Sequence, residues 1–470
     1  MRCLVVLLFL WSFAAVGSFG VQGYSSNESW IPPAKGGGHP PGVGHHPPGV
    51  GHHPPGVGHH TPIKDAVYAL QSWKKAIFND PYNITGSWVG DNPCDENATW
   101  IGVFCDHDPD TKQLVVAGID LNHALLAGSL VPELGWLKTV AIFHINSNYF
   151  QGGIPNTFRR LRRLSELDVS NNMLSGSFPR VVMRLPELVY LDLRFNQFHG
   201  PLPKKLFELP LDALFVNNNH FDGHLPETLG RSPVSVLVVA NNKLSGHIPK
   251  TIKNMSATLN EIIFLNNQIG GHLPKEIGAL KEALVFDVAE NNLRSQLPDS
   301  IKKMKNLEIF NIGENKFYGQ LTENLCGLPH LKNVTVADNF FNGEAPACSN
   351  LQERGVAFNI SGNCFGQSTG QKDDKICKKF YEELHPKPPS PKPEPPPSPP
   401  PAPPSLPPCT DFFPLPPWNS PPTISAPPPY PPFNSPSTMG PYYAPPSLPP
   451  CQLPPGVTWP PSWGPPPTPP

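Results

Sequence analysis

One motif returns along this sequence at a nearly constant interval. It reads ELDVSNNMLSGSFP from Glu166, and close variants begin at Tyr190, Val236 and Val285. Each copy has two apolar residues one position apart, an anchor residue that is usually asparagine, and then glycine and proline. Ten copies align 23 to 25 residues apart, with anchors at Ala124, Asn148, Asn172, Asn196, Asn219, Asn242, Asn267, Asn291, Asn315 and Asn339. One copy has too few apolar residues to bury a core alone, so the copies must stack on one another.

The spacing within a copy predicts its local structure. Two apolar residues separated by one position form a short strand whose side chains both point inward. The anchor asparagine lies at the following bend, where its amide can bond backbone groups of its own turn and the next. Glycine four places later permits a turn, and proline seven places later restricts the path on the convex side. The pattern predicts an α/β leucine-rich-repeat solenoid of about ten plant-type repeats with one inner parallel sheet.

Composition changes along the chain predict six segments. The N-terminus has an arginine, an apolar run and then small residues, which is typical of a secretory signal peptide. The last 86 residues hold 40 of the 66 prolines, which favours extended polyproline II. We expect a signal peptide at 1–23, a disordered His/Pro/Gly-rich segment at 24–62, an N-terminal cap at 63–118, repeats at 119–346, a C-terminal cap at 347–384 and a proline-rich tail at 385–470.

The N-terminal cap should begin with a helix. Val67, Leu70, Trp73 and Ile77 lie at helical spacing, and Asn79-Asp80-Pro81 should stop that helix.

Cysteines and glycosylation motifs agree with secretion. Removal of the signal peptide leaves eight cysteines, an even number. Cap positions and repeat spacing suggest the pairs Cys94–Cys105, Cys326–Cys348 and Cys364–Cys377, although spacing alone leaves other pairings open. The Asn-x-Ser/Thr rule marks six acceptors: Asn27, Asn83, Asn97, Asn254, Asn333 and Asn359.

Charge and motifs favour a binding or structural role. The formal net charge of −2 does not call for a nucleic-acid partner. Beyond the signal peptide, no apolar run approaches the about 18 to 20 residues of a membrane span. The sequence lacks HExxH, GxSxG and phosphate-loop motifs, and a flat repeat face would not shield a catalytic carboxylate pair. We therefore expect no enzyme activity, cofactor, nucleic-acid partner or membrane span.

Paired histidines in segment 24–62 raise the question of a metal site. Imidazole is a common ligand of zinc and copper. Binding would have to order a disordered segment, and no acidic or cysteine ligand is nearby, so we expect no metal site. A spacer that gains charge at acidic pH is the alternative. The pairs are His45-His46, His52-His53 and His59-His60.

Particular repeat stretches add a resemblance to a known family. AGIDLNHALLAG, FHINSN, YLDLRFNQF, SPVSVLVVANN, LNEIIFLNN and NFFNGEAPAC resemble the plant leucine-rich repeat extensins from about residue 63 to 377. The resemblance implies a secreted cell-wall protein that affects wall assembly and cell growth. It further implies a repeat domain that captures basic peptides of the rapid alkalinization factor type. The tail would be hydroxylated, glycosylated and insolubilised among wall polysaccharides or wall proteins, with cross-linking at Tyr430, Tyr442 and Tyr443.

The tail and the repeats depart from the family pattern in two ways. The tail has no serine followed by four prolines, and the repeats carry Gln151, His247 and His272 where some members have extra cysteines. A homodimer like the family's therefore stays open. The alternative function is a soluble inhibitor of wall-degrading enzymes that resembles polygalacturonase inhibitors, for which a proline-rich tail has no use.

The predicted binding surface is the concave face. Side chains between and just after the apolar pair point to that face and are not needed for the core. Acidic residues with exposed aromatic rings there would suit a basic peptide. The predicted ligand-binding residues are His144, Asn146, Asp168, Ser170, Tyr190, Asp192, Arg194, Phe195, Phe215, Asn217, Asp287, Glu290, Asn311, Glu314 and Asp338.

Overall fold

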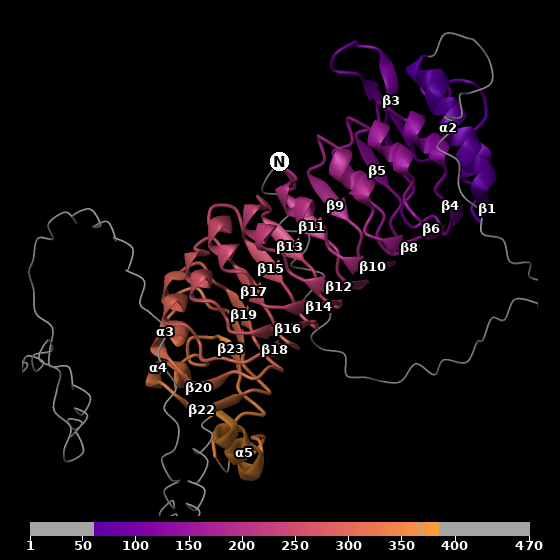
Figure 1. Cartoon of the computed structure of the whole chain (residues 1–470). Helices are drawn as coiled ribbons and strands as arrows, with labels where there is room; N and C mark the ends of the chain where they lie inside the picture. The colour runs from indigo at the N-terminus through magenta and orange to yellow at the C-terminus, as the bar shows by residue number, and fades with distance from the viewer. Residues whose placement is uncertain (1–60, 367, 385–470) are drawn as a thin grey trace, which may run out of the picture. The chain divides into compact units, whose positions relative to one another are not determined.

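The repeats stack into a coil with strands on its inner side and short helices on its outer side (Figure 1). The computed structural model describes residues 61–366 and 368–384. The predicted leucine-rich-repeat solenoid is confirmed.

The inner face is a 12-stranded sheet in which each repeat adds one strand next to the previous one. Only its first pair is antiparallel; every later pair is parallel and in register, as in Leu167 beside Leu191. The strands are β2 (Val103–His107), β3 (Leu114–Asp120), β5 (Ile142–His144), β7 (Glu166–Asp168), β9 (Tyr190–Asp192), β11 (Ala213–Phe215), β13 (Val236–Val238), β15 (Glu261–Ile263), β17 (Val285–Asp287), β19 (Ile309–Asn311), β21 (Asn333–Thr335) and β23 (Ala357–Asn359).

A second sheet follows the anchors, and the sequence pattern did not predict it. The segment after each anchor needs partners for its backbone N–H and C=O groups, and the same segment of the next turn supplies them. Nine strands form this sheet: eight follow anchors, and β1 from the N-terminal cap pairs antiparallel with the first of these. Strands β20 (Tyr318–Leu321) and β22 (Phe340–Glu344) form a separate pair. The nine are β1 (Ile77–Asn79), β4 (Ala127–Ser129), β6 (Tyr149–Gly152), β8 (Met173–Ser177), β10 (Gln197–Pro201), β12 (His220–His224), β14 (Lys243–Gly246), β16 (Gln268–Gly271) and β18 (Asn292–Leu293).

Short helices cover the convex side. The proline seven places after the anchor becomes the N-cap of a 3-10 helix in seven turns, from Pro155 to Pro298. The helices are η2 (Pro132–Trp136), η3 (Asn156–Arg160), η4 (Arg180–Arg184), η5 (Lys204–Glu208), η6 (Glu227–Arg231), η7 (Lys250–Met255), η8 (Lys275–Ala279) and η9 (Asp299–Lys303), followed by α3 (Glu323–Cys326) and α4 (Pro346–Ser349).

The anchor asparagines form the predicted polar ladder inside the coil. Asn172 Oδ1 accepts a bond from Phe150 N at 2.9 Å, and its Nδ2 donates to Ile145 O at 2.9 Å. Its Nδ2 also donates to Val169 O at 3.2 Å. Each asparagine anchor therefore bonds its own turn and the preceding one, rather than the next one as expected, and Ala124 has no side-chain amide with which to take part. Asn363 makes the same bonds, to Phe341 N and Val336 O, so the ladder continues one turn beyond the ten predicted anchors.

The N-terminal end is closed by a helix and aromatic packing. Helix α2 (Pro62–Ala76) starts at Thr61, whose hydroxyl oxygen accepts a bond from Lys64 N at 3.3 Å. It ends three residues before Asn79, earlier than predicted, because Ile77 begins β1 and pairs with β4 of the first turn. Trp73 is fully buried and stacks on Phe143 at 5.6 Å. A short 3-10 helix, η1 (Thr85–Ser87), follows β1.

The C-terminal end is closed by α5 (Asp374–Leu384). Phe380 stacks on Phe340 with ring centroids 3.7 Å apart, and Tyr381 donates its hydroxyl to Phe340 O at 2.7 Å. The disulfides are Cys94–Cys105 in the N-terminal cap, Cys326–Cys348 between adjacent turns and Cys364–Cys377, which ties α5 to the last turn, and these are the pairs that the spacing suggests. Within residues 61–366 and 368–384, no helix is long and apolar enough to cross a membrane.

Candidate ligand-binding face

The inner sheet presents parallel columns of side chains, one residue from each turn in each column. In β7, Leu167 points into the core and is fully buried, while Glu166 and Asp168 on either side of it are only half-buried. Register-matched pairing carries this alternation from strand to strand. Three regions with different chemistry follow one another along the face.

The first region, over β5 and β7, is a polar network. Ser170 donates its hydroxyl to Asp168 Oδ1 at 2.6 Å and accepts a bond from Asn146 Nδ2. Four predicted residues, His144, Asn146, Asp168 and Ser170, lie in this region, and Ser170 is fully buried rather than available to a ligand.

His144 and Glu166 form a titratable pair in the same region. His144 Nε2 lies 3.2 Å from Glu166 Oε2. Burial lowers the pKa of His144, but Glu166 and the charge of Asp168 outweigh burial, so the net shift is upward. The same contact lowers the pKa of Glu166. The pair therefore favours the imidazolium–carboxylate state.

The second region begins with an aromatic and charged cluster on β9 and β11. Arg194 Nε lies 2.8 Å from Asp192 Oδ2, and its guanidinium lies over the Phe215 ring at 5.1 Å. Tyr190 packs against Phe215 at 5.7 Å. Four predicted residues thus come together, although Asp192 is fully buried and Phe215 is nearly so. Burial raises the pKa of Asp192 to about 7, because it outweighs the attraction of Arg194.

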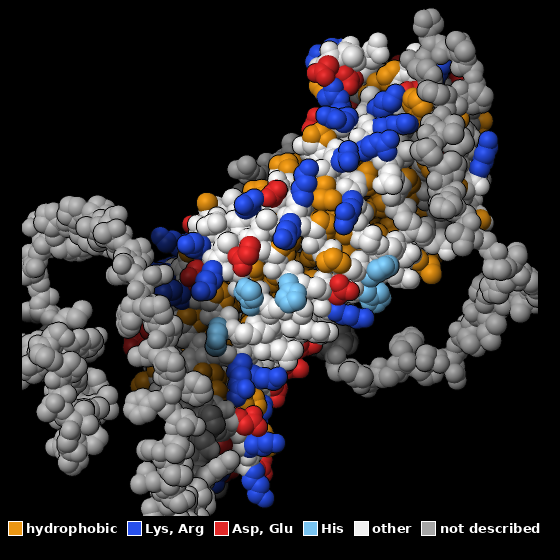
Figure 2. Space-filling model, in the orientation of Figure 1, with side chains coloured by type: hydrophobic (Ala, Val, Ile, Leu, Met, Phe, Trp, Pro, Cys, Tyr) orange, Lys and Arg blue, Asp and Glu red, His pale blue; other side chains and the backbone are white. Residues whose placement is uncertain are grey.

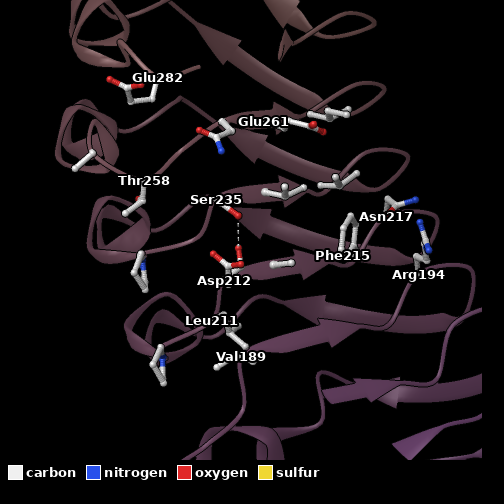
Figure 3. Close-up of a pocket in the computed structure, with 18 residues that line it drawn as sticks. Val189, Arg194, Leu211, Asp212, Phe215, Asn217, Ser235, Thr258, Glu261 and Glu282 are labelled. Carbon is white, nitrogen blue, oxygen red and sulfur yellow. Dashed lines mark hydrogen bonds between the residues drawn. The ribbon is translucent and has the colours of Figure 1, made fainter. Parts of the chain in front are cut away.

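The centre of the face is an apolar groove that the sequence pattern did not single out. It has a volume of about 990 Å³ and runs along β11, β13 and β15 (Figure 3). Ala213, Val236, Val238 and Ile263 form its floor together with Phe215. Arg194 and Asn217 lie at one end in Figure 3, and Asp212 and Glu282 lie towards the other. The sequence did carry a signal for this groove. In β13, which reads Val-Leu-Val, the residues on both sides of the core leucine are also apolar.

The third region, over β17 to β21, is acidic. Asp287 accepts bonds from Ala289 N at 3.0 Å and from Asn311 Nδ2 at 3.0 Å. Burial nevertheless raises the pKa of Asp287 to about 6. Burial and the charge of neighbouring Glu314 raise the pKa of Glu290. Glu290, Glu314 and Asp338 are exposed, so this region has the acidic character predicted for the face.

The residue before each anchor has a left-handed backbone. Asn218, Asn241 and Asn266 tolerate this conformation and bond one another through their side chains. Phe195 has φ of 51° and is 47% exposed, which is an unfavourable position for a bulky apolar residue. Phe195 follows Arg194 in the chain, and its exposed side chain is accessible to a ligand.

Other predicted sites are distributed as follows. The asparagines of the five sequons that the structure describes are exposed, and Asn333 and Asn359 belong to β21 and β23 of the inner sheet. In the described part of the chain, no group of three His, Cys, Asp or Glu residues is arranged to hold a metal ion. Asn27, the three histidine pairs and Tyr430, Tyr442 and Tyr443 lie outside the described residues.

Comparison with known proteins identifies the class. The leucine rich repeat N-terminal domain matches residues 63–106, and the leucine rich repeat matches residues 138–198. The protein is a leucine-rich-repeat protein with an N-terminal leucine-rich-repeat domain.

Curated relatives narrow this class to a family. Leucine-rich repeat extensin-like protein 2 of Arabidopsis thaliana is 53% identical over 230 residues, 49% of this chain and 29% of the relative. Leucine-rich repeat extensin-like protein 1 of Arabidopsis thaliana is 53% identical over 107 residues, 23% of this chain and 14% of the relative. Over its repeat region the chain is therefore a relative of the leucine-rich repeat extensin-like proteins, as the sequence resemblance predicted. The chain spans less than a third of the length of these curated relatives.

Solved structures with the same fold are plant leucine-rich-repeat proteins. The plant peptide hormone receptor RGFR1 in complex with RGF2 aligns with a TM-score of 0.51 at 22% identity, over 53% of this chain and 40% of the receptor. This likeness shows the fold alone. A plant ice-binding protein aligns with a TM-score of 0.53 at 25% identity, over 66% of this chain and 98% of that protein. Together, the comparisons indicate a leucine-rich-repeat fold and similarity to the leucine-rich repeat extensin-like proteins.

Proposed function

We propose that this chain is a cell-wall protein that binds a secreted basic peptide on the inner sheet and is held in the wall by its proline-rich tail. The rapid alkalinization factor type, which the family resemblance implies, is the proposed peptide class. Through this capture the protein would modulate wall assembly and cell growth.

The proposal rests on the order in which apolar and acidic side chains follow one another along the inner sheet. An apolar groove of about 990 Å³ along β11 to β15 is followed along the sheet, on the turns of β17 and β19, by the exposed carboxylates Glu290 and Glu314. A peptide that lies across the strands could place apolar side chains in the groove and cationic side chains over the acidic region. Buried apolar anchors supply affinity, and charge complementarity supplies orientation and association rate. A glycan at Asn333 or Asn359 would lie on the last strands and leave the groove accessible.

Direct binding tests the peptide-binding part. The full chain would be titrated with a synthetic rapid alkalinization factor peptide by calorimetry. Glu290→Gln with Glu314→Gln should weaken binding about tenfold at low salt, since two nearby carboxylates are lost. Val238→Arg should weaken it further by filling the groove with a cation.

Matched controls remove the same charge elsewhere. Glu323→Gln with Glu353→Gln alters two exposed carboxylates away from the inner sheet and should leave the affinity unchanged. Equal weakening by both pairs would mean that net charge rather than this face holds the peptide, and the proposal would be abandoned.

Extraction tests the wall-anchoring part. Protein with residues 385–470 should stay in the wall fraction after a salt wash, while a chain ending at residue 384 should be released. If the full-length protein washes out freely, the soluble inhibitor of wall-degrading enzymes becomes the better reading, and inhibition of polygalacturonase is then the assay to run.

A further inference from the structure

We propose that a basic patch on the convex side binds a linear polysaccharide of uronic acid units. The patch consists of Trp136, Lys138, Arg159, Arg160, Arg162 and Arg184, which line a depression of about 750 Å³ at the ends of η2, η3 and η4. It lies on the opposite side of the coil from the peptide face. Figure 2 shows Lys and Arg side chains gathered over the turns that carry the short helices.

The positive charge of the patch is poorly balanced. Lys138 pairs with Asp65 at 3.1 Å, and the neighbouring Arg163 pairs with Asp108 at 3.4 Å and with Asp110. Among the described residues, Arg160, Arg162 and Arg184 form no ion pair. Cations held close together repel one another, and an anionic partner that removes this repulsion is bound more strongly than by dispersed charges.

The patch has a defined edge. On the next turn, at the position of Arg160 and Arg184, stands Glu208, which pairs with Arg231 at 2.6 Å. The row of arginines at this position is therefore interrupted on that turn by an acidic residue.

Trp136 fixes part of the patch in place. Lys138 Nζ lies 4.5 Å from the centre of the Trp136 ring, and the Arg160 guanidinium carbon lies 5.2 Å from it. Cation–π contacts of this kind restrict flexible side chains before binding, so less entropy is lost when a ligand arrives.

The arrangement of the cations selects the kind of anion. They come from adjacent turns of a regular coil and form a row, so a single small anion can contact only some of them. A polymer with one carboxylate on each unit can contact the whole row. Arginine is suited to this role because its planar guanidinium bonds both oxygens of a carboxylate. The proposed wall location makes a uronate polysaccharide, rather than a polynucleotide, the available polymer.

The test is titration of the full chain with unesterified polygalacturonate. Arg160→Gln with Arg162→Gln and Arg184→Gln should weaken binding at least tenfold, and the affinity should fall less steeply between about 50 and 200 mM salt than in the wild type. Replacement of the same three residues by lysine should give a smaller loss, since charge is kept and the two-pronged bonds are lost. Fully methyl-esterified polygalacturonate and the galacturonate monomer should bind negligibly.

The matched control is Lys275→Gln with Lys302→Gln and Lys303→Gln, which removes the same charge from exposed positions on η8 and η9. This control should bind like the wild type. Equal loss in both triple variants, equal binding of the methyl ester, or equal displacement by single-stranded DNA would each overturn the proposal. The arginine variant should still bind the basic peptide, so failure of this proposal and failure of the peptide-binding function are distinguishable.

Discussion

The anchor asparagine is the residue on which each turn depends. Asn219 is 5% exposed; its Oδ1 accepts a bond from Phe198 N at 3.0 Å and its Nδ2 donates to Leu193 O at 2.9 Å. No other side chain of similar size supplies an acceptor and two donors in one plane. An anchor substitution therefore leaves buried backbone groups of two turns without partners.

We predict that Asn219→Ala lowers the free energy of unfolding by about 3 kcal/mol, because buried backbone groups lose their hydrogen bonds. Urea unfolding of the full chain measures this. Asn292→Ala, at an exposed asparagine whose Oδ1 accepts only a 3.3 Å bond from Lys316, should change stability by about 0.5 kcal/mol or less. Similar losses in the two variants would show that the ladder is not the source of stability.

The raised pKa of Asp287 makes the free energy of unfolding decrease as the pH rises. This pKa is raised to about 6 in the folded protein, from about 4 for an ordinary aspartate, mainly by burial. The folded state keeps this proton at pH values where the unfolded state has lost it, so stability falls as the pH rises from about 4 to about 6. Asp287→Asn should remove about 2 to 3 kcal/mol of this fall.

Thermal unfolding of wild type and Asp287→Asn at several pH values between 4 and 7 checks this prediction. Asp222→Asn, at an exposed carboxylate on β12, is the control and should leave the slope unchanged. An identical slope in all three proteins would contradict a raised pKa at Asp287.

At the scale of elements, the second sheet explains why glycine recurs four places after the anchor. Gly246 has φ of 81°, which glycine adopts without strain. A Cβ there would also lie 2.3 Å from Cδ2 of His224, whose side chain comes from the preceding turn. Close contact between neighbouring turns and a left-handed backbone are thus separate requirements at one position.

These requirements can be separated experimentally. Gly200 has nearly the same φ of 79° but nothing within 4 Å of an added Cβ. Gly200→Ala should cost about 1 kcal/mol from backbone strain alone, and Gly246→Ala should cost clearly more. His224→Ala combined with Gly246→Ala should recover the difference in urea unfolding. Equal costs for the two single variants would mean that the contact with His224 contributes nothing.

At the scale of the whole described molecule, stability comes from contacts between neighbouring turns. Each inner strand pairs only with the strands of adjacent turns, and each anchor bonds its own turn and the one before it. Such a coil tolerates removal of one whole repeat better than removal of part of a repeat, which puts the remaining repeats out of register.

Deletion of residues 242–266 removes one complete turn and joins Asn241 to the next anchor, Asn267. We predict a folded protein with unchanged circular dichroism per residue and reduced stability. Deletion of residues 242–253 removes half a turn, so the later repeats lose their register with the earlier ones. This variant should not show a single cooperative unfolding transition. If both deletions behave alike, the turns are not interchangeable units.

The sequence by itself determined the coil, its period and the asparagine ladder. These follow from spacing within one turn, and the same local bonds form in every turn. The sequence also predicted which side chains point to the concave face, because side-chain alternation in a strand is local.

Only the tertiary structure decided what the inner face offers a ligand. Ser170 and Asp192 lie at concave positions but are buried, and Val236, Val238 and Ile263 create a groove that no single repeat reveals. The second sheet and the basic patch likewise depend on which residues stack across successive turns. Burial, groove shape and unbalanced charge are properties of neighbouring turns in contact, so the pattern of one turn could not specify them.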